Sequence, residues 1–230
     1  MLAGEGGHDI RVTNVDAFDS RRHAGWLPRR DEDLERWIDG HRERASARSG
    51  PMHPVVERLR AELDADPVLR MGVTRMVDQV PHGRQYRTRH VHDVDELLHL
   101  VDAVLTAAPE YGDSTMVMLP LAAVLDWTMA TPAGYAVYHD PRMNRWLSDL
   151  LQVWSEFLSG PESRYVLDDS PAGWLSPAAL AAIGIERFQH DPAAPHFGFA
   201  SWNDFFTRRL RDGARPVAAP EDPVPAERAR

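Results

Sequence analysis

The chain has no cysteine and no lysine, because all 26 of its basic residues are arginine. Without a lysine amine, no side chain can form a Schiff base and no P-loop lysine exists, which excludes the usual pyridoxal-phosphate chemistry. Without cysteine, the chain has no disulfide, no thiol nucleophile, no iron–sulfur cluster and no thiolate zinc site. These absences exclude classes of enzyme, and they leave the redox compartment undetermined.

Long apolar runs and a basic leader are also missing. No run of apolar residues approaches the ~20 that span a bilayer, so no transmembrane segment is expected. Residues 1–18 have neither the basic nor the apolar region of a signal peptide, and we therefore expect a cytoplasmic location. A net charge of −9 argues against a general nucleic-acid binder.

What the chain does contain is helical periodicity interrupted by proline and glycine, with hardly any strand alternation. Residues 94–105 and 141–158 carry apolar stripes at three- and four-residue spacing, which is typical of amphipathic packing helices. Residues 31–48 are charged nearly all round, which predicts a helix on the outside of the bundle. Residues 52–65 and 67–80 are expected to form two short helices separated by a proline.

Residues 116–130 are apolar around most of the helix circumference, so they are expected to form a central buried helix that ends at Thr131-Pro132-Ala133-Gly134. The pattern predicts a mainly α fold, an irregular multi-helix bundle with little or no sheet. We divide the chain into a flexible N-terminal segment (1–25), a helical domain (26–212) and a tail or linker rich in proline and alanine (213–230).

Histidines and acids gather around the start of the helix over 94–105, at His90, His92, Asp93, Asp95, Glu96 and His99. Glu96 and His99 have the Glu-x-x-His spacing that di-iron carboxylate bundles use. Those sites need a second such motif and two more glutamates on facing helices, and no other predicted helix carries the motif. Acids favoured by the helix dipole at a solvated helix start explain the cluster better, so no metal site is predicted.

Asp126 lies within the apolar helix over 116–130, where a carboxylate must find hydrogen-bond donors or remain neutral. Arginine is the only long cationic side chain available to it. A buried structural pair and a substrate-binding acid both fit this position. Tyr135, Tyr138 and His139 follow the turn that ends the helix, and they either line a pocket there or belong to the core.

Familiar catalytic motifs are absent, including Gly-x-Ser-x-Gly, a Gly-rich dinucleotide loop and His-Glu-x-x-His. One long segment is nevertheless specific: Phe199–Pro216, with the sequence FASWNDFFTRRLRDGARP, resembles the signature that phosphatidylserine decarboxylases carry just ahead of their catalytic domain. Further segments resemble the extra N-terminal domain of the subgroup with fungal L-tryptophan decarboxylases. They are Gly25-Trp26-Leu27-Pro28, Met52-His53-Pro54-Val55, Leu125-Asp126-Trp127 followed by Thr131-Pro132-Ala133-Gly134, and Ser163-Arg164-Tyr165-Val166-Leu167. On these residues the chain is identified as a member of the family.

The resemblance implies a pyruvoyl enzyme, in which the chain cleaves itself at a Gly-Ser bond and the serine becomes the carbonyl that binds the substrate amine. Every serine of this chain follows a residue other than glycine. No catalytic residue of the family is therefore carried over, and a pyruvoyl group is expected only on a separate catalytic subunit. The expected function is that of a non-catalytic N-terminal associated domain with this subunit as its partner. The upstream motifs favour a soluble aromatic amino acid over a phospholipid as substrate, and the choice stays open.

The signature segment is the candidate partner interface. Ser201 and Asp204 predict the start of a helix over 202–210, which combines large aromatic side chains with a basic cluster. The candidate residues are Trp202, Asn203, Asp204, Phe205, Phe206, Arg208, Arg209, Arg211 and Arg215. Two alternatives are that the aromatics pack on the preceding helices while the arginines are solvated, and that the arginines make peripheral contact with a membrane.

Two other functions remain open. One is a stand-alone helical enzyme or small-molecule binding protein, with a site near Asp126, Tyr135, Tyr138 and His139. The other is a truncated gene product without a separate role.

Overall fold

The computed structural model describes residues 31–48, 50–80, 91–112 and 120–215. Several sequence-based predictions lie outside the described residues. These are the flexible segment 1–25, the motif Gly25-Trp26-Leu27-Pro28, His90, the first part of the helix over 116–130 and most of the tail over 213–230.

The described residues are mainly helical. The helices are α1 (Asp31–Ala47), α2 (Pro54–Ala65), α3 (Pro67–Asp78), α4 (Val94–Val104), α5 (Pro120–Met129), α6 (Pro132–Tyr138), α7 (Pro141–Ser159), α8 (Pro177–Ile183) and α9 (Trp202–Phe206), with 3-10 helices η3 (Pro161–Val166), η4 (Ile185–Arg187) and η5 (Pro195–Gly198). Within the described ranges, β pairing is limited to an isolated antiparallel bridge between Phe188 and Leu210. The mainly α prediction is confirmed. None of the helices in these ranges is both long and apolar enough to cross a membrane.

Proline begins most of the helices, since it is the first residue of α2, α3, α5, α6, α7 and α8. Its fixed φ suits the first turn, where the missing N–H has no helical partner to lose. The residue before the proline often accepts a backbone N–H with its side chain, as Asp66 does at α3 and Ser176 at α8. The prolines of the sequence therefore mark helix starts as well as helix ends.

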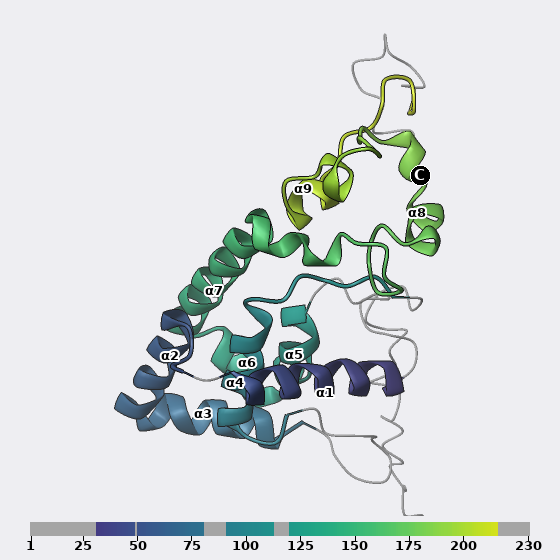
Figure 1. The fold of residues 1–230 in the computed structure, drawn as a ribbon. Coiled ribbons are helices and arrows are strands. Elements are labelled where there is room, and N and C mark those ends of the chain that lie inside the picture. Colours follow the sequence, from purple (N-terminus) through teal and green to yellow (C-terminus); the bar gives the residue numbers. More distant parts are fainter. Residues whose placement is uncertain (1–30, 49, 81–90, 113–119, 216–230) are drawn as a thin grey trace, which may run out of the picture.

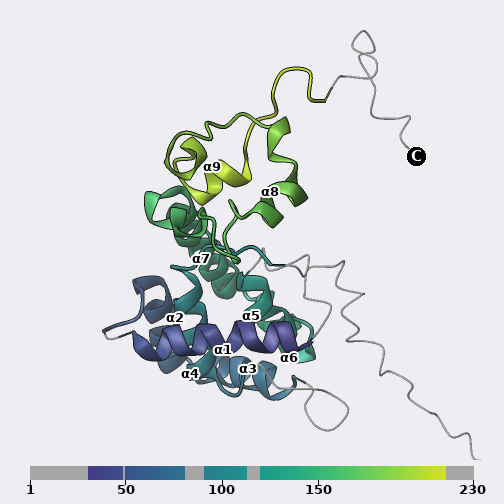
Figure 2. The ribbon, with the colours of Figure 1, turned by 45° about the vertical axis from the view of Figure 1, so that its right-hand side comes forward.

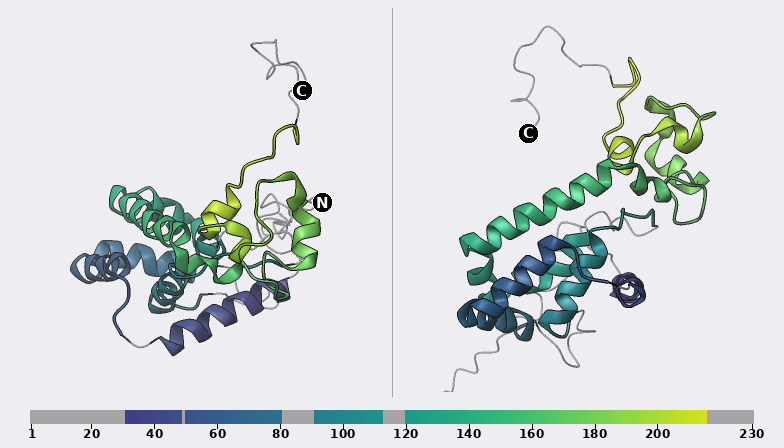
Figure 3. Two further views of the ribbon diagram at one scale, coloured as in Figure 1. Left: turned by 45° about the horizontal axis from the view of Figure 1, so that its top comes forward. Right: turned by 60° about the vertical axis from the view of Figure 1, so that its left-hand side comes forward.

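The helices divide into two groups, which we call the body (residues 31–159) and the cap (residues 160–215). In Figure 1 the helices α1 to α6 gather along the lower part of α7, while α9 lies at its upper end and α8 farther to the right. The turned view in Figure 2 keeps the same arrangement, with α8 and α9 side by side above the body. Figure 3 shows α7 running along the body and reaching the cap, so this helix links the two groups.

One face of α7 supplies much of the core. Met143, Trp146, Leu150, Trp154 and Leu158 are buried at three- and four-residue spacing, as the apolar stripe predicts. The indole N–H of Trp146 donates to the Val55 carbonyl of α2 at 2.8 Å. The indole N–H of Trp154 donates to the Ala107 carbonyl at 3.0 Å, so both large rings are buried with their polar atom satisfied.

The turn after α5 differs from the sequence-based expectation, because it also begins α6. Thr131 caps α6 by accepting the Gly134 N–H at 2.9 Å, and its hydroxyl donates to the Thr128 carbonyl at 2.8 Å. A Cβ on Gly134 would lie 1.8 Å from the Thr128 carbonyl oxygen, so only glycine fits this corner. The described part of α5 is largely buried, as predicted for this helix.

The last helix is shorter than the predicted span 202–210. Ser201 caps α9 as expected, with its Oγ accepting the Asp204 N–H at 3.1 Å. After Phe206 the chain extends and pairs with residues 187–189: the Gln189 N–H donates to the Arg209 carbonyl at 2.8 Å, and the Arg211 N–H donates to the Arg187 carbonyl at 2.9 Å. This pairing ends the helix because the backbone groups find partners on another segment instead of the next turn.

Candidate functional site

The signature segment is built into the cap by its aromatic side chains. Trp202 and Phe205 are buried, and Phe205 is only 1% exposed. The Phe205 ring lies 5.5 Å from the Trp174 ring and 5.3 Å from the Phe199 ring. The backbone N–H of Trp202 donates to the hydroxyl of the buried Ser163 at 2.9 Å. Trp202 and Phe205, two of the nine predicted interface residues, therefore anchor the segment in the interior of the cap.

Arg208 lies over two aromatic rings. Its guanidinium carbon is 4.3 Å from the centre of the Phe188 ring and 4.9 Å from that of Phe205. Burial lowers the pKa of Arg208, and the nearby Arg187 lowers it further. The guanidinium therefore makes cation–π contacts with both rings, which its planar shape suits.

The remaining predicted interface residues face outward or hold local structure. Asn203 donates to the Ser159 hydroxyl at 3.2 Å, and Asp204 accepts the Ala200 N–H at 2.9 Å. Phe206 is 50% exposed and stacks on Trp202 at 4.8 Å. The exposed arginines of the segment are Arg209, Arg211 and Arg215.

We call Phe206, Arg209 and Arg211 the cap surface. Alternation along an extended strand puts Arg209 and Arg211 on the side opposite to Leu210. Neither forms an ion pair with a carboxylate in the described part of the chain; the Arg211 Nε instead donates to the Phe188 carbonyl at 2.9 Å. The cap surface thus combines an exposed phenyl ring with two arginines that form no ion pair with any carboxylate of the described residues.

The residues of the predicted pocket near Asp126 lie in different environments in the structure. Tyr138 points into the core, where its hydroxyl bonds to the Thr128 hydroxyl at 3.0 Å, and burial raises its pKa to about 12. Tyr135 is 67% exposed, and its ring lies 4.2 Å from the ring of His139. Asp126 is partly buried on α5. Tyr138 therefore lies in the core, whereas Tyr135 lies on the exposed face of α6.

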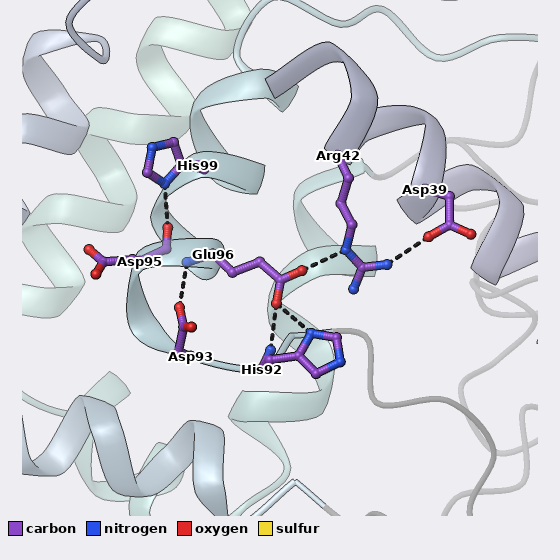
Figure 4. Close-up of polar contacts among 7 residues, drawn as sticks. All are labelled: Asp39, Arg42, His92, Asp93, Asp95, Glu96 and His99. Atoms are coloured by element: carbon purple, nitrogen blue, oxygen red, sulfur yellow. Dashed lines mark hydrogen bonds and ion pairs between the residues drawn. The ribbon is translucent and has the colours of Figure 1, made fainter. Parts of the chain in front are cut away.

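The histidine and acid cluster forms a polar junction between α1 and α4 (Figure 4). The carboxylate of Glu96 accepts the Arg42 Nε at 2.5 Å, and it accepts both the backbone N–H and the ring Nδ1 of His92 at 2.7 Å. Burial raises the pKa of Glu96, but the bonds from Arg42 and His92 outweigh it, so the net pKa is lowered. Glu96 is an ion-pair partner here.

The ring and the carboxylate of the Glu-x-x-His motif do not meet, because His99 and Glu96 bond to different partners. Its ring Nδ1 bonds to the Asp95 carbonyl at 2.7 Å on its own helix (Figure 4). In the described ranges no group of three or more histidine, aspartate or glutamate side chains is arranged to hold a metal ion.

A pocket of about 480 Å³ opens beside this junction, between α1 and α4. Its polar lining includes Arg48 and Asp102, which sequence reasoning did not single out. Asp102 is buried, and its carboxylate accepts the His53 N–H at 2.7 Å and the Arg48 NH1 at 2.8 Å. The sequence did contain a signal for a buried Asp102. This residue lies four positions after Leu98 and three before Leu105, on the apolar face of α4.

Comparison with known proteins decides the family. The phosphatidylserine decarboxylase family model matches residues 53–183, which is more than half of the chain. The chain belongs to this family. The match begins at the residue that caps α2 and ends at the last residue of α8, so it includes most of the body and enters the cap.

Relatives within the family are fungal decarboxylases. The L-tryptophan decarboxylase of Psilocybe cubensis is 32% identical over 220 residues, covering 86% of this chain and 47% of that protein. The L-tryptophan decarboxylase of Psilocybe cyanescens is 29% identical, covering 83% and 45%, and the decarboxylase iboD of Amanita muscaria is 32% identical, covering 54% and 40%. The chain spans less than half the length of these curated relatives.

Proposed function

We propose that this chain is the non-catalytic helical domain of a pyruvoyl-type decarboxylase, and that it acts by docking onto a catalytic unit through the cap surface. Family membership and the similarity to L-tryptophan decarboxylases support a decarboxylase-related role. The same similarity favours an aromatic amino acid as the substrate of the assembled enzyme. The pyruvoyl group would supply the electrophilic carbonyl on the catalytic unit.

The serines of this chain do not fit the pyruvoyl group. None of them follows glycine, which self-cleavage at a Gly-Ser bond requires. Ser163 and Ser201 are also buried and committed to structure: Ser163 accepts the Trp202 N–H, and Ser201 accepts the Asp204 N–H.

The observation that carries the proposal is the positive charge of the cap surface, whose arginines form no ion pair within the described part of the chain. Phe206, Arg209 and Arg211 are exposed on a segment whose neighbours Trp202 and Phe205 are locked in the core. Aromatic and arginine side chains supply most hot spots of protein interfaces, and a rigid support lowers the entropy lost on binding. An acidic face on the catalytic unit would complement the two arginines.

The test uses the part of the Psilocybe cubensis enzyme that lies outside the matched half. We take this unmatched part as the catalytic part, and it is expressed alone, with the matched half of its own chain, or with the present chain. We expect the present chain to co-elute with the catalytic part in size-exclusion chromatography and to raise the release of CO₂ from L-tryptophan above that of the catalytic part alone.

A triple variant, F206A/R209E/R211E, is expected to lose both co-elution and the gain in turnover. The matched control is Arg145→Glu, which reverses an exposed arginine on α7 outside the cap. A folded wild-type chain that neither co-elutes nor changes turnover would contradict the proposal. So would equal effects of the triple variant and the control.

A further inference from the structure

We propose that the pocket between α1 and α4 binds a small molecule that carries an oxyanion, either a carboxylate or a phosphate, and that Arg48 anchors this group. The pocket belongs to the body and is separate in sequence from the cap surface, so the inference goes beyond the proposed function. Its volume of about 480 Å³ lies within the range of roughly 300–1,000 Å³ that is typical of small-molecule sites.

The two carboxylates in the pocket wall are already satisfied. Glu96 receives bonds from the guanidinium of Arg42 and from the backbone and ring of His92. Asp102 receives bonds from Arg48 and from the His53 N–H. Neither carboxylate needs a cationic ligand. The hydrogen-bonding groups of the pocket wall that remain unused are therefore mostly donors.

Arg48 is the main source of these donors. Its NH1 is engaged with the carboxylate of Asp102 at 2.8 Å and with the Asp102 carbonyl at 3.3 Å. Its Nε and NH2 have no hydrogen-bond partner among the described residues, and its side chain is 37% exposed. Because Asp102 is buried and fixed, it holds one edge of the guanidinium and leaves the other nitrogens for an oxyanion, which a planar guanidinium binds with parallel N–H bonds.

The rest of the lining suits a ligand with both a polar and an apolar part. Ser46 adds a hydroxyl. The Nδ1 of His99 bonds to the Asp95 carbonyl, and its Nε2 has no hydrogen-bond partner among the described residues. Met52 and Leu100 provide apolar wall. The chemistry that fits is an oxyanion at Arg48 with a compact apolar group over Met52 and Leu100.

The experiment titrates the chain alone with four probes in calorimetry: benzoate, phenyl phosphate, inorganic phosphate and benzylamine. We expect saturable binding of benzoate or phenyl phosphate, weaker binding of inorganic phosphate, and none of benzylamine. Benzoate above phenyl phosphate would assign a carboxylate ligand, and the reverse order a phosphate ligand. Absence of saturable binding by all three anions, or binding of benzylamine as tight as that of benzoate, would overturn the proposal.

Arg48→Lys separates ligand binding from a structural role. A lysine still neutralises Asp102 but lacks the second nitrogen of the fork, so the melting temperature should change little while affinity for the anion falls about tenfold. Arg58→Lys, at an exposed ion pair with Asp149, is the matched control and should bind as the wild type does.

A second variant keeps the test decisive if Arg48→Lys unfolds. Ser46→Asp puts a negative charge into the pocket wall at an exposed position and leaves the Arg48–Asp102 pair intact. It should also weaken anion binding about tenfold. Unchanged affinity in both variants would refute Arg48 as the anchor and this pocket as the site.

Discussion

The body and the cap use arginine in different ways. In the body, ion pairs join segments that are far apart in the sequence, including Arg42–Glu96, Arg48–Asp102, Arg58–Asp149 and Arg142–Asp66. In the cap, no residue from 160 to 215 forms an ion pair with any described residue. Its carboxylates cap turns and helices instead, as Asp204 does at α9 and Asp168 at Ser170.

This contrast identifies the region whose arginines remain available to bind a partner. The arginines of the body that pair with carboxylates have much of their charge compensated within the molecule. In the cap, Arg208 is held by aromatic rings, and Arg209 and Arg211 stay exposed. A region that is held together by aromatic contacts can keep its arginines for a partner, which is the basis of the docking proposal.

The largest expected effect tests whether aromatic packing holds the cap. Phe205→Ala removes the ring that contacts Trp174, Phe199 and Arg208, and it should cost about 3–5 kcal/mol of unfolding free energy. Phe206→Ala is the matched control, since its exposed ring should cost less than about 1 kcal/mol. Urea unfolding measures both. Equal losses would mean that the cap does not depend on its buried aromatics.

Sequence reasoning located the helices of the body better than the contacts of either region. The stripes of α4 and α7 are local patterns, and the structure follows them. The Arg42–Glu96 and Arg48–Asp102 pairs each join residues 54 positions apart, so no local pattern could predict them. The cation–π contact of Arg208 with Phe188 likewise joins separate segments. The extended pairing that shortens α9 is long-range for the same reason.

A second prediction concerns the corner between α5 and α6, which the sequence predicted only as the end of the helix over 116–130. Gly134→Ala brings a methyl group against the Thr128 carbonyl, and overpacking of this kind should cost about 1–3 kcal/mol. Gly40→Ala is the control within α1, where a Cβ meets nothing within 4 Å and alanine should stabilise by about 0.5–1 kcal/mol. Thermal melts should therefore shift in opposite directions, and shifts of the same sign would contradict the steric argument.

A third prediction uses pH to weaken the body selectively. Hydrogen bonds from Arg142 lower the pKa of Asp140 to about 2, and they also lower the pKa of Asp66. Because the folded pKa values lie below those of the unfolded chain, this stabilisation is present above about pH 4 and is lost as the pH falls towards 2. NMR titration of the Asp140 carboxyl checks the shift. In Arg142→Gln the two carboxyl pKa values should rise, and unchanged values would remove Arg142 as the cause.

The smallest effects compare single arginines in the two regions. Arg58–Asp149 is an exposed pair, so Arg58→Gln should cost less than about 1 kcal/mol, and 0.5 M NaCl should abolish the difference by screening. Arg208→Gln loses the contacts with Phe188 and Phe205, which should cost about 1–2 kcal/mol. This cost should persist in salt because the rings partly shield the guanidinium from solvent. Denaturant unfolding at low and high salt measures both variants, and an equal salt dependence would mean that the two regions do not hold arginine by different physical means.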